Sequence, residues 1–174
     1  MIVIRKAERA DAAAIAHVHV ESWRTTYAGI VPDAYLESLD EAARAKAWES
    51  LVETNDCLVA ARDGHVVGFI TGGAIREPVE ECDAELYAIY LLAEAQRARI
   101  GAGLLRELVR LLRQKGFRSM AVWVLEKNPS KNFYIRTGAH HAATKDIVIG
   151  GLTLLEEAFA WPDLAQITFP AITA

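Results

Sequence analysis

The spacing of hydrophobic and polar residues predicts a strand followed by three helices in the first third of the chain. Ile2–Arg5 reads as a short strand, and apolar residues recur at helical spacing from Asp11 to Tyr27. Residues 29–33 contain glycine and proline and interrupt this pattern. Two shorter helices are predicted after the break, at Ala34–Leu39 and Glu41–Thr54.

Three strands are predicted next. Cys57–Arg62 and His65–Ile75 are β-rich runs joined by Asp63-Gly64, a strong hairpin signal, so we expect them to pair antiparallel. Arg76–Asp83 is charged, contains a proline and is expected to form a loop. Glu85–Leu92 has the length and apolar character of a central strand that is buried on both faces.

The strongest helical pattern lies at Ile100–Lys115, where leucine and isoleucine repeat at helical spacing up to Gly116, a suitable C-cap. A further strand is predicted at Ser119–Leu125. Together with Glu85–Leu92 these segments form a βαβ unit, whose two strands are expected to be parallel with a right-handed crossover.

The C-terminal part predicts a short helix at Ser130–Thr137 and two strands within His140–Phe159 that turn at Gly150-Gly151. The fold class expected is α/β, with a mixed, partly antiparallel central sheet and helices on both faces. A chain of 174 residues without a repeat or linker fits one domain, residues 1–174.

Composition indicates a soluble protein of a reducing compartment. Hydrophobic residues make up 52% and charged residues 24% of the chain, and the apolar stretch Ile147–Leu155 is about half as long as a membrane span. Charge appears by Arg5, too early for a signal peptide, so a cytoplasmic location without a membrane partner is expected. Cys57 and Cys82 form no CxxC pair and are expected to be reduced thiols.

Charge and histidine spacing argue against two further classes of ligand. A net charge of −4 disfavours a nucleic-acid partner, because binding phosphates requires a basic face. His17 and His19 are two apart on a predicted helix, and His140 and His141 are adjacent on a predicted strand, so neither pair shares a face. We therefore predict no metal site.

The turn between the central strand and the long helix is a candidate anion site. Backbone N–H groups and the helix dipole create positive potential there. Small residues within Gln96–Gly103 allow close approach to the main chain, while Arg97 and Arg99 add charge. Diphosphate binding is one interpretation, and an ordinary strand-to-helix turn with solvated arginines is the other, because a Gly-x-Gly pair alone is a weak signal.

Several segments of the chain resemble the GCN5-related N-acetyltransferase (GNAT) family. The turn matches as Gln96-x-x-Arg99-x-Gly101, and the segments 85–91 and 123–134 resemble the family's splayed strands and Asn…Phe-Tyr helix. The resemblance extends to residues 22–33 and to the Ile149-Gly150-Gly151 hairpin. The resemblance covers nearly the whole chain. It implies an enzyme that transfers an acetyl group from acetyl-CoA to a primary amine of a small molecule or protein.

The resemblance also implies a cofactor-binding set. The main chain of residues 89–91 would bond the pantetheine arm, the turn would hold the diphosphate, and Asn128 would orient the cofactor or the backbone, with helix capping as its alternative role. The cofactor-binding residues implied are Ile89, Tyr90, Leu91, Gln96, Arg97, Ala98, Arg99, Ile100, Gly101, Ala102 and Asn128.

Arg99 departs from the family pattern, which has a glycine at this position of the turn. If the position requires a positive φ, an arginine introduces about 1–2 kcal/mol of strain. If it adopts an ordinary helical start, Arg99 can instead add a charge-assisted contact to a phosphate. Both alternatives are open from the sequence.

Acetyl transfer requires a group that protonates the departing thiolate and a group that deprotonates the amine. By resemblance, Tyr134 is the general acid, with a partly buried core tyrosine as the alternative. Glu85 is the candidate base, since burial in a cleft raises the pKa of a carboxylate. A solvent-facing glutamate, a base at Glu81 or Asp83, and a water chain without a dedicated base are the alternatives.

The acceptor side is expected to involve Trp23, Tyr27 and Tyr87, with core packing as the alternative role of these rings. The partner would be a small-molecule or peptide amine, and a homodimer is compatible with the family. Two other functions stay open: a non-catalytic acyl-CoA-binding or interaction module, motivated by Arg99 and the lack of an unambiguous base, and an acyltransferase for a longer acyl-CoA.

Overall fold

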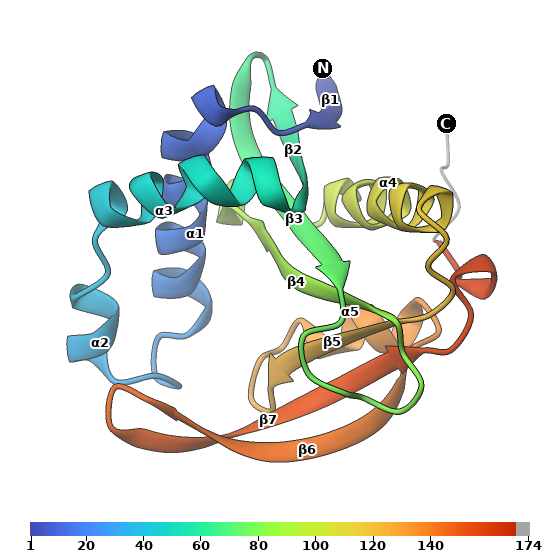
Figure 1. The fold of residues 1–174 in the computed structure, drawn as a ribbon. Helices are drawn as coiled ribbons and strands as arrows, with labels where there is room; N and C mark the ends of the chain where they lie inside the picture. The colour runs from blue at the N-terminus through green and yellow to red at the C-terminus, as the bar shows by residue number, and fades with distance from the viewer. Residues whose placement is uncertain (170–174) are drawn as a thin grey trace.

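The protein folds around one seven-stranded sheet (Figure 1). The computed structural model describes residues 1–169, so the last five residues of the predicted domain lie outside the described part. The strands are β1 (Ile2–Lys6), β2 (Asp56–Arg62), β3 (His65–Ala74), β4 (Ala84–Leu91), β5 (Met120–Leu125), β6 (His140–Ile149) and β7 (Leu152–Trp161). The α-helices are α1 (Ala12–Thr26), α2 (Asp33–Glu37), α3 (Glu41–Thr54), α4 (Ile100–Gln114) and α5 (Lys131–Arg136).

The strand order is β1-β2-β3-β4-β5-β7-β6. Over residues 1–169, β4 and β5 form a parallel pair, and the other neighbouring strands are antiparallel. Helices α1 and α3 cover one face, while α4 and α5 pack on the other (Figure 1). The predicted mixed α/β fold with helices on both faces is confirmed.

Helix α4 is held to the sheet by the leucine pattern that predicts it. The side chains of Leu104, Leu105, Leu108 and Leu112 are fully buried against β2–β5. Burying each of them stabilises the fold by about 1.5–3 kcal/mol. Gly116 follows the helix with φ of +94°, so the predicted C-cap is confirmed.

The two predicted hairpins also form. Asp63 and Gly64 have φ of 51° and 85°, which matches the right-handed twist of the flanking strands β2 and β3. Gly150 has φ of +57°, and a Cβ on it would lie 2.8 Å from the Cβ of Tyr35. Only glycine therefore allows the β6–β7 turn to pack against α2.

The parallel pair β4–β5 separates after three residues. Pairing joins 84–86 to 120–122 and ends there. On the other side of β4, the register with β3 shifts so that Leu86 faces Gly72 and Ala88 faces Thr71, which leaves Tyr87 as the extra residue of a bulge. From Tyr87 onward one edge of β4 therefore has no strand beside it.

Candidate active site

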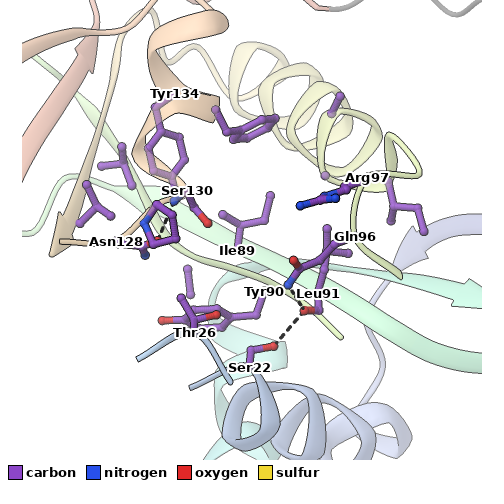
Figure 2. Close-up of a pocket in the computed structure, with 18 of the residues that line it drawn as sticks. Ser22, Thr26, Ile89, Tyr90, Leu91, Gln96, Arg97, Asn128, Ser130 and Tyr134 are labelled. Carbon is purple, nitrogen blue, oxygen red and sulfur yellow. Dashed lines mark hydrogen bonds between the residues drawn. The ribbon is translucent and has the colours of Figure 1, made fainter. Parts of the chain in front are cut away.

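A cavity of about 580 Å³ lies where β4 and β5 diverge (Figure 2). Its walls come from α1, β4, the start of α4, β5 and α5. The sequence-predicted residues that line it are Tyr27, Tyr87, Ile89, Tyr90, Leu91, Gln96, Arg97, Arg99, Ile100, Gly101, Ala102, Asn128 and Tyr134. The structure thus brings together most of the predicted site, but Trp23, Glu85 and Ala98 are not part of the lining.

The free edge of β4 is anchored at the carbonyl oxygen of Leu91. This oxygen accepts hydrogen bonds from Ser22 Oγ at 3.2 Å and from Gln96 Nε2 at 3.3 Å (Figure 2). Ser22 belongs to α1 and Gln96 to the turn before α4, so the two bonds fix both walls of the cavity to the same strand.

The turn before α4 contains two arginines in the left-handed region. Arg97 has φ of +61°, and Arg99, the N-cap of α4, has φ of +60° and ψ of 9°. The position of Arg99 therefore requires a positive φ, the first of the two alternatives that the sequence leaves open. The strain at one such non-glycine residue is about 1–2 kcal/mol.

The two glycines at the start of α4 have different surroundings. Gly101 lines the cavity, and a Cβ added to it would make only ordinary contacts, the nearest at 3.5 Å from Leu91 Cδ1. Gly103 faces the sheet instead, and a Cβ there would lie 2.8 Å from Ile4 Cδ1 on β1. The second glycine therefore lets α4 approach β1, while the first keeps the main chain at the helix start accessible.

Tyr134 reaches the cavity from α5 and is 6% exposed. Its ring packs edge-on against Phe133 and Trp161, with centroids 5.6 and 5.9 Å away. Burial raises the pKa of its hydroxyl above the usual value, so the group is protonated at neutral pH. Within residues 1–169 we find no hydrogen-bond partner for this hydroxyl, which leaves its proton available for donation.

Aromatic hydroxyls cluster on the wall opposite α4. Asn128 Nδ2 donates to the hydroxyl of Tyr27 at 3.0 Å, and Trp23 Nε1 donates to the hydroxyl of Tyr90 at 3.0 Å. Burial raises the pKa of both Tyr27 and Tyr90. Trp23, predicted as an acceptor-side residue, thus contacts the site through Tyr90 rather than by lining the cavity.

Glu85, the predicted base, is only 3% exposed and is engaged by Arg76. Its Oε1 accepts a bond from Arg76 Nη2 at 2.5 Å, and its Oε2 accepts bonds from the backbone N–H and Nε of Arg76 at 3.0 and 3.2 Å. Arg76 also lies over the Tyr87 ring, 4.1 Å from its centroid. The carboxylate therefore ties the β3–β4 loop to β4, a geometry that does not favour a free base.

Sequence reasoning missed several lining residues. These are Ser22, Thr26, Ala88, Val122, Trp123, Val124, Pro129, Ser130, Phe133 and Arg136. Most of them lie one or two positions from a residue that was predicted. Trp123 belongs to the segment 123–134 that resembles the family, which was a signal that could have found it. Arg136 had no such signal, because residues two apart on a helix point to different sides.

Residues 1–169 show neither a metal-ligand cluster nor a membrane-spanning helix. No group of three or more histidine, cysteine, aspartate or glutamate side chains is arranged to hold a metal ion in this part of the chain. None of its helices combines the length and apolar character needed to cross a bilayer.

Comparison with known proteins gives one consistent family. The sequence profile described as "Acetyltransferase (GNAT) family" matches residues 15–139. An uncharacterized N-acetyltransferase of Bacillus subtilis, YuaI, is 42% identical over 167 residues, which cover 96% of each chain. The spermidine N(1)-acetyltransferase of Thermoplasma acidophilum is 30% identical over 145 residues, 79% of this chain and 87% of that protein.

A solved structure supports the same assignment. The crystal structure of the PaiA N-acetyltransferase from Thermoplasma acidophilum in complex with coenzyme A superposes with a TM-score of 0.72 at 28% identity. The superposition covers 90% of this chain and 98% of that one. With the family profile and the B. subtilis relative matching most of the sequence, the chain belongs to the acetyltransferase (GNAT) family.

Proposed function

We propose that this cavity binds acetyl-CoA and that the protein transfers its acetyl group to a primary amine of a small molecule or peptide. One observation carries the proposal: the divergence of β4 and β5 opens a cavity onto which a free strand edge, a helix start and the Tyr134 hydroxyl all converge. A similar chain was solved with coenzyme A, and a curated relative is named for spermidine acetylation.

The residues present fit the two parts of coenzyme A. Main-chain groups on the free edge of β4, at Tyr87–Leu91, can pair with the amides of a pantetheine arm as a strand would. Backbone N–H groups at the start of α4, together with Arg97, Arg99 and Arg136, provide the positive potential that a diphosphate requires.

The reaction joins the amine nitrogen to the acetyl carbon and breaks the carbon–sulfur bond. Bound acetyl-CoA supplies an activated thioester. We assign to Tyr134 the donation of its proton to the departing sulfur, since its buried hydroxyl is protonated and opens on the cavity. An ammonium acceptor loses two protons in all: one passes to solvent before the attack, and the other, released when the carbon–nitrogen bond forms, returns by way of solvent to Tyr134.

The acceptor is expected on the aromatic side of the cavity, where Tyr27 and Tyr87 line the wall and Trp23 supports Tyr90. The net charge of −4 is compatible with a cationic amine. Spermidine, other aliphatic amines and amino-terminal peptides therefore form the first panel of acceptors to test.

The proposal is tested with purified protein, acetyl-CoA and this panel, by following release of the coenzyme A thiol. We expect turnover with at least one amine and a fall in kcat of roughly 10²–10³-fold in Tyr134→Phe, since proton donation contributes on that order. The Kd for acetyl-CoA, measured by calorimetry, should change little in this variant.

Three outcomes of the same experiment separate the alternatives. Binding of acetyl-CoA without turnover for any amine would favour a non-catalytic acyl-CoA-binding module. Faster turnover with a longer thioester would favour another acyl donor. If the protein neither binds acetyl-CoA nor turns over any amine, the proposed function is excluded.

Location and assembly are proposed on separate grounds. Cys57 and Cys82 are free thiols, which suits a reducing compartment such as the cytoplasm. A homodimer stays a prediction from the family resemblance, and gel filtration of the purified protein tests it.

A further inference from the structure

The face of the sheet beneath the end of α1 carries a half-buried carboxylate that the sequence did not single out. Glu156 lies on β7, where it pairs with Leu125 of β5 on one side and Lys145 of β6 on the other. Residues directly opposite on antiparallel strands point to the same face, and so do residues two apart on one strand. Glu156 therefore shares its face with Trp123, which lines the cavity.

The Glu156 carboxylate acts electrostatically on two hydroxyls of that cavity, although Glu156 is not among the lining residues. Its negative charge contributes to the raised pKa of both Tyr27 and Tyr90, and the side chain is 17% exposed. Glu85, by contrast, has both oxygens occupied by Arg76. Of these two carboxylates, Glu156 is the more exposed, with a side-chain exposure of 17% against 4% for Glu85.

A cation already occupies the space between Glu156 and the cavity wall. The Lys145 ammonium lies 3.9 Å from the centroid of the Trp123 ring and 3.8 Å from Glu156 Oε2, and it also pairs with Glu77. An aromatic face and two carboxylates are the surroundings that stabilise an ammonium ion. At 3.8 Å the contact with Glu156 is longer than a charge-assisted hydrogen bond, so this carboxylate is only partly satisfied.

We propose that Glu156 receives the ammonium group of the acceptor amine on the Trp123 side of the cavity, and that Lys145 is the resident cation which the acceptor displaces. The assignment rests on the proposed acetyl transfer to a primary amine. Lys145 can swing away without losing all its contacts, because its pairing with Glu77 lies in the exposed β3–β4 loop.

The charges that surround Glu156 set the direction of its titration. Burial raises its pKa, the negative charges of Glu77 and Glu85 raise it further, and Lys145 lowers it. The negative charge of Glu156 also contributes to the raised pKa of the Arg76 guanidinium. Amine binding should therefore weaken as the pH falls and Glu156 is protonated, and removal of Lys145 should move this loss to higher pH.

The test measures spermidine binding by calorimetry to protein saturated with coenzyme A, and spermidine acetylation with acetyl-CoA. In Glu156→Gln we expect the Kd and KM for spermidine to rise about tenfold, with the Kd for acetyl-CoA changed less than about twofold. The acid-side loss of binding should disappear, since glutamine does not titrate. In Lys145→Met the Kd for spermidine should fall several-fold.

Glu157→Gln is the matched control. Glu157 is the next residue on β7, points to the opposite face and pairs with Lys131 at 2.9 Å, so its variant should bind spermidine as the wild type does. Melting temperatures of all variants report whether each one folds.

The outcomes are distinguishable from failure of the proposed function. Wild-type binding and pH dependence in Glu156→Gln, a weaker Kd in Lys145→Met, or a loss of spermidine binding in Glu85→Gln alone would overturn the assignment. Absence of turnover with every amine in the wild type would instead count against the acetyl transfer, while the calorimetric comparison would still decide the role of Glu156.

Discussion

Asn128 donates its side-chain amide to the hydroxyl of Tyr27 at 3.0 Å, across 101 residues of sequence. Tyr27 is the C-cap of α1, and Asn128 lies in the connection from β5 to α5, so the bond joins two walls of the cavity. The carbonyl oxygen of the same amide accepts the Ser130 N–H at 2.8 Å and shapes the entry to α5. One buried amide therefore positions both the aromatic wall and the helix that carries Tyr134.

We predict that removing either partner of this bond destabilises the fold. Tyr27→Phe leaves a buried amide hydrogen without an acceptor and should lower the free energy of unfolding by about 1–3 kcal/mol. Asn128→Ala removes both of its bonds and should have a larger effect. Urea unfolding of the two single variants and the double variant measures the coupling, expected near 1 kcal/mol. Strictly additive effects would show that the bond contributes nothing.

Replacing Arg99 by glycine should instead stabilise the fold. Glycine at this position relieves about 1–2 kcal/mol of left-handed strain but adds about 0.5–1 kcal/mol of unfolded-state entropy. Arg99→Gly should therefore raise the free energy of unfolding by about 0.5–1 kcal/mol, measured by urea titration. Arg99→Ala is the control, because it loses the same charge and keeps the strained φ. Equal stability of the alanine and glycine variants would contradict the strain argument.

Local patterns were sufficient to predict most of the fold. The leucines of α4 repeat at 3.6-residue spacing, and both hairpin turns contain residues that tolerate positive φ, so these elements depend on neighbours in the sequence. The main chain of β4 and the turn before α4 were also predictable by resemblance, because they form one continuous segment of the chain.

The contribution of β7 to the proposed acceptor side was not predictable, because it depends on pairing between distant strands. Glu156 and Trp123 share a face of the sheet because β7 lies next to β5. The residues that neighbour each of them in the sequence give no signal of this strand order. The environment of Glu85 depends on Arg76, which reaches back across the β3–β4 loop. The conformation of Arg99 likewise followed from the three-dimensional turn and not from its residue type.

The buried Glu85 leads to a third prediction. Arg76→Gln removes the cation that compensates an almost fully buried carboxylate, which should lower the free energy of unfolding by about 3 kcal/mol. The double variant Arg76→Gln/Glu85→Gln should recover part of this loss, because no uncompensated charge remains. Urea unfolding at neutral pH measures both. A double variant less stable than Arg76→Gln would show that the carboxylate is held by other groups.

His19 should make the protein sensitive to mild acid. The ring lies among Trp48, Phe69 and Tyr90, and burial lowers its pKa from 6.5 to about 4. Above pH 6.5 the imidazole is neutral in the folded and unfolded states and has no effect on the pH dependence. Below pH 6.5 the imidazole binds a proton in the unfolded state but stays neutral in the folded state. The free energy of unfolding therefore falls by about 3 kcal/mol by pH 4.

The measurement is the free energy of unfolding at pH 7 and pH 4 for the wild type and His19→Gln. From pH 7 to pH 4 the free energy of unfolding should fall about 2–3 kcal/mol less in the variant than in the wild type, because glutamine takes up no proton. His65→Gln, at an exposed position beside the β2–β3 turn, should keep the wild-type difference. An unchanged pH dependence in His19→Gln would mean that the folded state admits the charged imidazole, with the aromatic cluster opening to water around it.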